Sequence, residues 1–248
     1  MSVVCLLPAR NAAADLPGYM ESASRFCDAI VALDDGSTDD TRRILEQSRF
    51  VQILLTNPPR RRFHGWHDGV NRNRLLLAAS ELDPDWIISI DADERLDPTD
   101  AAAFRGFIET DALPGCAYGL QHFRMWGPRQ FDPHFTWIYR LFAFEPGQAF
   151  PNRRLHFNPV PTSIPRPRWV RTTIRVQHLG ADDEVRQLER LEKYRDVDPA
   201  GEYTTDQGGL GKAPAGDLPR WRARSPNDPI LYPARGEPRR KRRRLFRR

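Results

Sequence analysis

The chain has 248 residues, 40% of them apolar, which is enough to bury the core of one large α/β domain or two small ones. A wholly disordered chain is therefore excluded. The formal charge is +5, but nine basic residues and one acid from Arg235 to Arg248 contribute +8 and leave −3 for residues 1–234. A mildly acidic body does not indicate a nucleic-acid groove across the domain, so we do not expect the domain itself to bind nucleic acid.

The cysteines and the first apolar run indicate the compartment. Cys5, Cys27 and Cys116 are widely spaced and form no CxxC pair, which is typical of a reducing compartment. The run VVCLLP is stopped by Pro8 and Arg10, too soon for a signal peptide, and no run reaches the roughly 18 to 20 apolar residues of a membrane span. We expect a cytoplasmic protein, at most peripheral on the inner face of the membrane.

Strand and helix patterns alternate over the first 110 residues. Short apolar runs predict buried strands at 2–7, 29–35, 51–55 and 86–90. Apolar residues at helical spacing predict helices at 16–26, 36–47 and 68–82, the last with an apolar face of Val70, Leu75, Leu77 and Ala78. Such alternation predicts a parallel sheet flanked by helices, with ligands at the carboxyl ends of its strands.

The pattern changes after residue 110. Strand-like runs at 116–126, 136–144 and 171–179 are joined by proline-rich loops, which favours an antiparallel or mixed arrangement. One more helix is predicted over 182–196, with Val185, Leu188, Leu191 and Tyr194 as its apolar residues. From about residue 200 the periodicity disappears, so we interpret residues 200–248 as a basic tail that is disordered or bound to a surface.

Two acidic clusters follow predicted strands: Asp34 with Asp35, and Asp91 with Asp93 and Glu94. Carboxylates at the mouth of a buried strand repel one another, and a bound cation relieves that repulsion. Oxygen ligands suit Mg²⁺ and Mn²⁺, and on an extended segment Asp91 and Asp93 would share one face. The simpler alternative is that these acids end strands, cap helices and form turns.

Four segments, in this order and spacing, resemble the nucleotide-sugar half of family-two glycosyltransferases: CLLPARNAAADLPGYMESA, AIVALDDGSTDDTRRIL, NRNRLLLAA and WIISIDADERL. The resemblance implies an α/β fold of GT-A type, a Rossmann-like, mostly parallel sheet flanked by helices with a mixed or antiparallel C-terminal half. It divides the chain into a nucleotide-sugar-binding half (1–110), an acceptor-binding half of the same domain (111–199) and the tail (200–248).

The same resemblance implies roles for individual residues. The donor nucleotide would be lined by Pro8, Ala9, Arg10, Asn11, Asp34, Asp35, Arg72, Asn73 and Asp91. A divalent metal, Mn²⁺ or Mg²⁺, would be held by the DxD pair Asp91 and Asp93 and by His178, which stands in a segment, RVQHLG, similar to a late His-x-Gly of the family.

The implied reaction transfers a sugar from a nucleotide diphosphate donor to an acceptor hydroxyl with inversion, on a sugar, lipid-linked or protein acceptor in cell-envelope or surface polysaccharide synthesis. Inversion needs a general base, for which Asp132 and Glu145 are candidates. Asp132 is preferred because FDPHF is typical of a loop that could reach the site. Trp126, Trp137 and Tyr139 are either a sugar-stacking platform or core residues.

Two alternatives stay open. A nucleotidyltransferase acting on sugar phosphates also uses acidic strand ends, but it needs a glycine-rich phosphate loop after the first strand, and PARNAAAD has no glycine. A non-enzymatic protein could bind RNA or membrane through the tail. Basic residues interleaved with Leu245 and Phe246 could lie on an anionic leaflet or stay solvated.

Overall fold

The computed structural model describes residues 1–60, 62–63, 65–181, 183–201 and 216–232. Its strands are β1 Val3–Ala9, β2 Ala29–Asp34, β3 Val51–Thr56, β4 Trp86–Ser89, β5 Glu94–Arg95, β6 Ala117–Trp126, β7 Gln130–Ala143 and β8 Trp169–His178. Its helices are α1 Leu16–Ala23, α2 Thr41–Gln47, α3 Asp68–Ala79, α4 Pro98–Thr110 and α5 Glu184–Val197, with short 3₁₀ turns η1 Ser80–Leu82 and η2 Arg166–Arg168.

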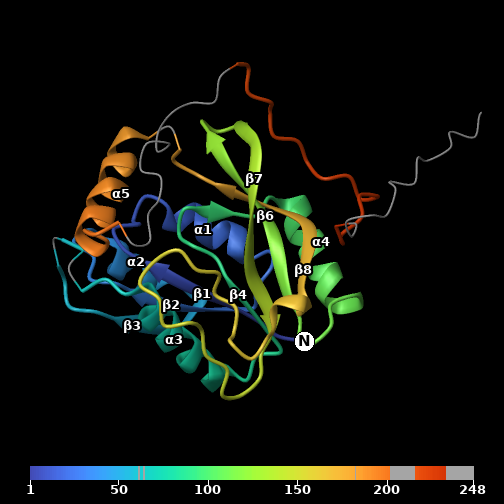
Figure 1. Ribbon diagram of the computed structural model, residues 1–248, viewed down its shortest axis with the longest axis horizontal. Coiled ribbons are helices and arrows are strands. Elements are labelled where there is room, and N and C mark those ends of the chain that lie inside the picture. The colour runs from blue at the N-terminus through green and yellow to red at the C-terminus, as the bar shows by residue number, and fades with distance from the viewer. Residues whose placement is uncertain (61, 64, 182, 202–215, 233–248) are drawn as a thin grey trace, which may run out of the picture.

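All eight strands join one sheet in the order β3-β2-β1-β4-β7-β6-β8-β5 (Figure 1). The strands β3, β2, β1 and β4 are parallel to their neighbours. Beyond β4 the sheet is mixed, because β7 runs antiparallel to β4 and β6, β6 is parallel to β8, and β5 is antiparallel to β8. The predicted class, a largely parallel α/β sheet with a mixed C-terminal half, is confirmed.

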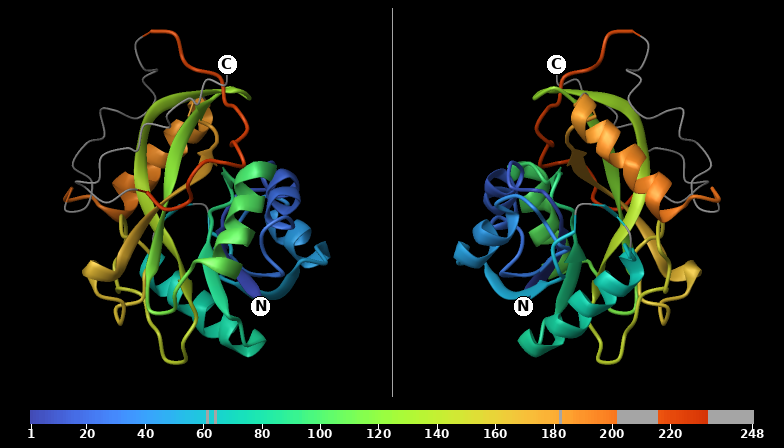
Figure 2. Two further views of the ribbon diagram at one scale, coloured as in Figure 1. Left: turned by 90° about the vertical axis from the view of Figure 1, so that its right-hand side faces the viewer. Right: turned by 90° about the vertical axis from the view of Figure 1, so that its left-hand side faces the viewer.

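Helices cover both faces of the parallel strands (Figure 2). On one face Cys5 and Leu7 of β1 pack in a core with Phe104 of α4. On the other face Val4 and Leu6 pack in a second core that includes residues of α3. Because successive side chains of a strand point to opposite faces, a strand buried on both sides must be apolar throughout, which explains the uninterrupted run at β1.

The predicted apolar faces of two helices are partly wrong. In α3, Leu75 and Ala78 are buried as expected, but Val70 and Leu77 are exposed. Three successive leucines cannot share one face of a helix, so the run at 75–77 left the buried side ambiguous. In α5, Val185 and Leu188 are exposed, because the opposite side of the helix faces the protein.

The described part of the predicted tail, residues 216–232, packs on the domain. Its backbone bridges to β7 at Gln130 and to β8 at Thr172. Arg224 is buried and donates hydrogen bonds to the Thr173 carbonyl oxygen (2.8 Å) and the Pro229 carbonyl oxygen (2.8 Å). The basic residues 235–248 lie outside the described residues. None of the helices that the structure describes combines the length and the apolar character needed to cross a bilayer.

Candidate active site

The acidic segment after β4 is a tight turn and not an extended strand. The Glu94 amide donates to the Asp91 carbonyl oxygen (2.9 Å), and the Asp91 amide donates to Glu94 Oε2 (2.8 Å). The chain then forms β5, where Glu94 pairs with His178 of β8. The segment is therefore not extended, so the condition for a shared face is not met, and the two aspartates bond to different partners.

Asp91 is held by two arginines. Its Oδ1 lies 2.8 Å from Arg72 Nη2, and its Oδ2 lies 3.2 Å from Arg140 Nη1. Arg72 also donates to Asp68 Oδ1 (2.9 Å) and Ser89 Oγ (2.6 Å). Burial would raise the pKa of Asp91, but Arg140 and Arg72 outweigh it and hold that pKa well below its usual range. Asp91 is therefore an ionised anchor of the turn.

Glu94 is the most enclosed of the three acids, with its side chain 2% exposed. Its Oε2 lies 2.6 Å from Arg140 Nη1, and its Oε1 lies 3.0 Å from His122 Nε2. Burial lowers the pKa of His122, and its ring packs 4.7 Å from the ring of His178. Arg140 thus links Asp91 to Glu94, and Glu94 links the turn to β6.

Asp93 and His178 face each other across the end of β8. His178 Nε2 lies 3.1 Å from Asp93 Oδ2, and the Leu179 amide donates to the Asp93 carbonyl oxygen (2.8 Å). Burial would lower the pKa of His178, but the Asp93 carboxylate raises it. Burial would raise the pKa of Asp93, but His178 lowers it. The other ring nitrogen of His178, Nδ1, is buried and has no hydrogen-bond partner among the residues that the structure describes.

The pair of Asp93 and His178 offers a carboxylate oxygen and an imidazole nitrogen, a donor set that fits Mn²⁺ and, less well, Mg²⁺. The structure brings together these two of the three predicted ligands, whereas Asp91 is engaged by arginines. In the described part of the chain, no three His, Cys, Asp or Glu side chains are grouped as a metal site. Any further ligands would come from the substrate or from water.

Helix α5 places a basic face over this turn. Arg186 Nη2 lies 3.0 Å from Asp15 Oδ1, and Arg190 Nη2 lies 3.9 Å from Asp93 Oδ2. Lys193 Nζ lies 3.7 Å from the centre of the Trp66 ring, and burial lowers the pKa of Lys193. These three residues are spaced by four and three positions, so they share one side of the helix. That side faces the site, which is why the apolar side is exposed.

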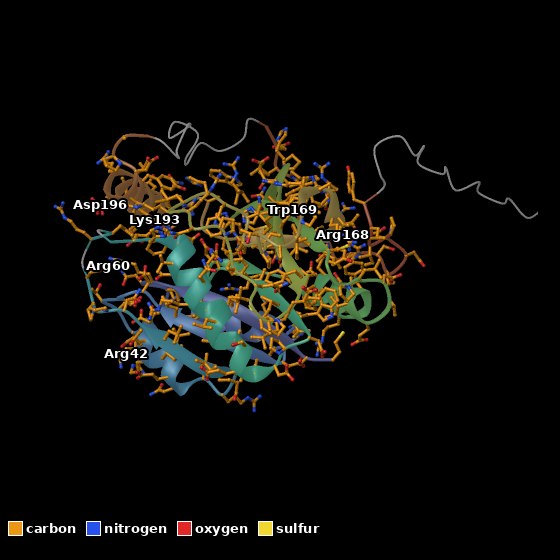
Figure 3. The ribbon with its side chains drawn as sticks, turned by 60° about the horizontal axis from the view of Figure 1, so that its bottom comes forward. Arg42, Arg60, Arg168, Trp169, Lys193 and Asp196 are labelled. Atoms are coloured by element: carbon orange, nitrogen blue, oxygen red, sulfur yellow. The ribbon has the colours of Figure 1, made fainter. Side chains whose placement is uncertain are left out.

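The loop between β3 and α3 lies against α5. The Phe63 amide donates to Asp196 Oδ2 (3.0 Å), and Figure 3 shows Lys193 and Asp196 on the same side of the molecule as Arg60. Arg60 in turn bonds to Asp35, whose carboxylate is buried and also accepts from Asn57 Nδ2 (2.5 Å). Helix, loop and the end of β2 therefore form one connected wall.

The ends of β1 and β2 are tied together beside this wall. Ala9 pairs with Asp34, whose Oδ1 accepts from the Ser37 amide (3.1 Å). The Asn11 amide donates to Ser37 Oγ (3.0 Å), and Asn11 Oδ1 accepts from the Thr38 amide (2.9 Å). Pro8 and Ala9 are the last residues of β1. The predicted donor-lining residues 8–11, 34 and 35 thus occur together at the carboxyl edge of the sheet.

Arg10 has unused hydrogen-bonding capacity at this edge. Its Nη2 donates to the carbonyl oxygens of Arg60 (2.7 Å) and Arg62 (2.9 Å), and its guanidinium lies 4.3 Å from the centre of the Phe63 ring. Its Nε and Nη1 and the Nε of Arg60 are buried without a partner among the described residues. Burial, together with Arg60, lowers the pKa of Arg10. Two adjacent guanidinium groups with unpaired N–H groups favour a ligand rich in oxygen acceptors.

A family model described as glycosyl transferase family 2 matches residues 4–169. The chain belongs to this family. An uncharacterised protein of Mycobacterium tuberculosis and one of Mycobacterium bovis are each 30% identical to it over 95 residues, which is 38% of this chain and 23% of theirs. The chain therefore spans less than a quarter of these curated relatives.

Solved structures similar to this family 2 protein include S. aureus TarS 1–349, with 14% identity, 80% of this chain and 66% of that chain covered, and a TM-score of 0.48. The same TarS fragment in complex with UDP shows 21% identity, coverage of 52% and 37%, and a TM-score of 0.40. Glucosyl-3-phosphoglycerate synthase from Mycobacterium tuberculosis, in complex with Mn²⁺, UDP and glucosyl-3-phosphoglycerate, shows 25% identity, coverage of 51% and 45%, and a TM-score of 0.37. At TM-scores below 0.5, these likenesses carry nothing about ligands.

The structure places one predicted base of this family 2 protein, Asp132, inside β7 and the other, Glu145, just after it. Asp132 is inside β7 and not in a loop, and its buried carboxylate accepts from Arg124 Nη2 (2.8 Å) and the His134 amide (2.9 Å). Glu145 is exposed just after β7. Because Ala143 pairs with Trp86 at the start of β4, Glu145 lies at the opposite edge of the sheet from Asp91, roughly 23 Å along the strand direction. An antiparallel or mixed C-terminal half was predicted, but the pattern did not indicate that the end of β7 would lie beside the start of β4.

Asn73 is also placed differently from the prediction. Its side chain accepts from the Phe150 amide (2.7 Å) and donates to the Phe150 carbonyl oxygen (3.1 Å), so it anchors a loop and does not face the nucleotide edge. Sequence reasoning missed His122, Arg140 and Arg190. A signal existed for the first two, since each is a charged or titratable residue inside an apolar strand. Only the packing of α5 reveals the third.

Proposed function

We propose that this chain is a metal-dependent glycosyltransferase that moves a sugar from a nucleotide diphosphate donor to an acceptor hydroxyl. The observation that carries the proposal is the facing pair of Asp93 and His178 beside Arg190, at the carboxyl edge of the parallel strands. Departure of a nucleoside diphosphate concentrates negative charge, and cationic groups fixed in place stabilise that charge best. We propose residues 1–110 as the donor half and 111–199 as the acceptor half of one domain.

Asp93 and His178 would hold Mn²⁺ or Mg²⁺, which when bound neutralises charge on the leaving diphosphate. Arg190 lies 3.9 Å from Asp93, close enough to turn its guanidinium to a diphosphate oxygen. Arg72 and Arg140 hold Asp91 and the turn in position, so Asp91 can orient the ribose or sugar of the donor. Their ion pairs keep the turn rigid before the donor arrives.

The donor nucleotide would lie against the ends of β1 and β2. Supporting this are the unpaired N–H groups of Arg10 and Arg60 and the carboxylates of Asp34 and Asp35 at the same edge. In the structure the Arg60 guanidinium donates a hydrogen bond to the Asp35 carboxylate. A base or ribose that hydrogen-bonds to Asp35 would therefore displace Arg60 and free its guanidinium for the donor.

Inversion requires a general base near the acceptor hydroxyl, and we assign it to His122 in place of Asp132 and Glu145. Burial lowers the pKa of His122, so the ring is neutral near pH 7. A hydrogen bond from Nε2 to Glu94 selects the tautomer that leaves Nδ1 as the proton acceptor. The variant His122→Gln should lower turnover while keeping the donor-induced thermal shift; unchanged turnover would remove the assignment.

A thermal-shift screen over nucleoside diphosphates with and without Mn²⁺ tests the donor site. The screen compares the common nucleoside diphosphates, each alone and with Mn²⁺, because the carboxylate and imidazole donors of Asp93 and His178 suit this ion. A ligand at about 100 times its Kd stabilises the native state by about 2.7 kcal/mol. We expect Asp93→Asn to lose the Mn²⁺-dependent part of the shift. Asp83→Asn, which removes an exposed carboxylate at the other end of β4, should keep it.

Labelled nucleotide sugars distinguish the reaction classes. A transferase releases nucleoside diphosphate in the presence of metal, also by slow hydrolysis without an acceptor. A nucleotidyltransferase would instead make or break the pyrophosphate bond, and that product would overturn the proposal. A protein that showed neither product nor any nucleotide-induced shift would support the non-enzymatic alternative.

The acceptor is proposed as a sugar, lipid-linked or protein hydroxyl in cell-envelope or surface polysaccharide synthesis. We propose that residues 235–248, with nine basic residues and one acid, rest on an anionic membrane surface and bring the enzyme to that acceptor. Deleting these residues should leave donor hydrolysis in solution unchanged. Loss of hydrolysis on deletion would favour the alternative hypothesis, in which the protein acts through its tail.

A further inference from the structure

One end of the mixed sheet exposes both arginines and apolar side chains. We name this surface the β8 patch and define it as Leu113, Arg166, Arg168, Trp169, Leu231 and Tyr232. Leu113 is 64% exposed and Leu231 47% exposed, and both arginines are exposed. Exposed apolar residues usually occur singly on a protein surface, whereas here exposed leucines, aromatic rings and arginines occur together.

Ring and guanidinium contacts join the arginines to Trp169 and to β7. The Arg166 guanidinium lies 3.9 Å from the centre of the Trp169 ring, and Trp169 packs 4.8 Å from the ring of Tyr139. Arg171 Nε then donates to Tyr139 Oη (3.3 Å). The Tyr139 ring packs directly on the backbone of Gly119 in β6, because a Cβ at that position would come within 2.8 Å of the ring.

The row continues to the last described residues. The Arg171 guanidinium lies 5.2 Å from the centre of the Trp137 ring, which packs 5.0 Å from the ring of Tyr232. The Tyr232 amide donates to the Arg171 carbonyl oxygen (2.9 Å), and Leu231 bridges to Thr172. The segment that leads to residues 235–248 is therefore fixed to the patch by backbone hydrogen bonds.

The arginines of this region lack carboxylate partners in the described part of the chain. In the residues that the structure describes, no carboxylate lies within 4.0 Å of the guanidinium of Arg166, Arg168 or Arg171. Some arginines elsewhere on the surface are paired, as Arg105 is with Asp28 (2.7 Å). In the sequence, residues 235–248 carry a formal charge of +8 and begin three positions after Tyr232.

We propose that the β8 patch is a docking surface for the anionic headgroups of a lipid bilayer. Guanidinium groups bind phosphates, while Trp and Tyr rings favour the headgroup region. Exposed Leu113 and Leu231, and Leu245 and Phe246 in the sequence, gain from a membrane interface but have little to gain from RNA, which favours lipid over nucleic acid. This inference deepens the proposed membrane association and does not rest on the transferase activity.

The patch is remote from the acidic turn. Strand β8 begins at Trp169 and ends at His178, a span of roughly 30 Å for an extended chain. Figure 3 shows Arg168 and Trp169 on the side of the molecule away from Lys193 and Arg60. A bilayer on the patch would therefore leave the turn open to donor, so binding and donor hydrolysis can be measured separately.

Vesicle cosedimentation of the full chain tests the surface, using phosphatidylcholine alone and phosphatidylcholine with about 30% phosphatidylglycerol. We expect binding only to the anionic vesicles. Each arginine at an anionic surface contributes roughly fivefold to partitioning, so Arg166→Glu with Arg168→Glu should weaken it at least roughly 25-fold. Leu113→Ser should weaken it roughly tenfold.

Matched controls carry the same chemical change elsewhere. Arg42→Glu with Arg43→Glu alters two exposed arginines of α2, and Leu77→Ser alters an exposed leucine of α3. Equal loss in patch and control variants would reduce the effect to net charge and overturn the proposal, as would unchanged binding of the patch variants. Tighter binding to single-stranded RNA than to anionic vesicles would overturn it in favour of nucleic acid. Donor hydrolysis in solution, expected unchanged in all four variants, reports separately on the proposed activity.

Discussion

Replacing Arg140 by Met should destabilise the fold through Glu94. Arg140 is 13% exposed and lies 2.6 Å from Glu94 and 3.2 Å from Asp91. Methionine keeps much of the side-chain volume but leaves Glu94, 2% exposed, with His122 as its remaining side-chain partner. Removing one member of a buried ion pair costs about 3 to 5 kcal/mol. Asp91 is 30% exposed and keeps Arg72, so we expect the lower end, about 3 kcal/mol.

Urea unfolding followed by circular dichroism measures this loss. With a slope of about 2 to 3 kcal/mol per molar, the midpoint should fall by roughly 1 M with the slope unchanged. The rescue variant is Arg140→Met with Glu94→Gln, which removes the unpaired charge and should recover at least about 1 kcal/mol. A loss below about 1 kcal/mol, or no recovery in the double variant, would refute the view that Arg140 neutralises Glu94.

Three further changes test separate parts of the structure. Gly69→Ala should cost about 1 to 3 kcal/mol despite the better helix propensity of alanine, because its Cβ would lie 2.7 Å from the Arg153 nitrogen; a rise in urea midpoint would contradict this packing. Burial would raise the pKa of Asp97, but hydrogen bonds from Thr99 and Trp221 lower it. The ionised Asp97 carboxylate therefore contributes its full stabilisation above the pKa of the unfolded chain, about 3.9. That stabilisation is lost as the pH falls through the lower pKa of the folded protein. Trp221 fluorescence between about pH 5 and pH 2 should show that loss in the wild type and not in Asp97→Asn. Asp132→Asn should lower stability by about 1 to 3 kcal/mol without lowering turnover, whereas a folded variant with no turnover would restore Asp132 as the base.

Much of the fold follows from local sequence pattern. The apolar runs at β1, β2 and β4 match strands covered on both faces, and the spaced apolar residues between them match helices. The acidic residues at the ends of β2 and β4 were found for the same reason, since parallel strands bring their carboxyl ends to one edge. Residues whose neighbours are set by these elements, such as Asp34 and Asp93, were therefore placed at the correct edge.

Contacts between distant elements could not be found in this way. Glu94 meets Arg140 from a strand 46 positions away, and Glu145 lies at the wrong edge because β7 returns antiparallel to β4. Likewise, the basic side of α5 faces the site only because Asp15 and Asp93 lie beneath it. By itself the sequence determined the strands, the helices and the edge where the acids gather, because these depend on periodicity and chain direction. The tertiary structure alone decided which charge neutralises which, because that depends on strand order, register and helix rotation, and these arise from packing between segments far apart in the chain.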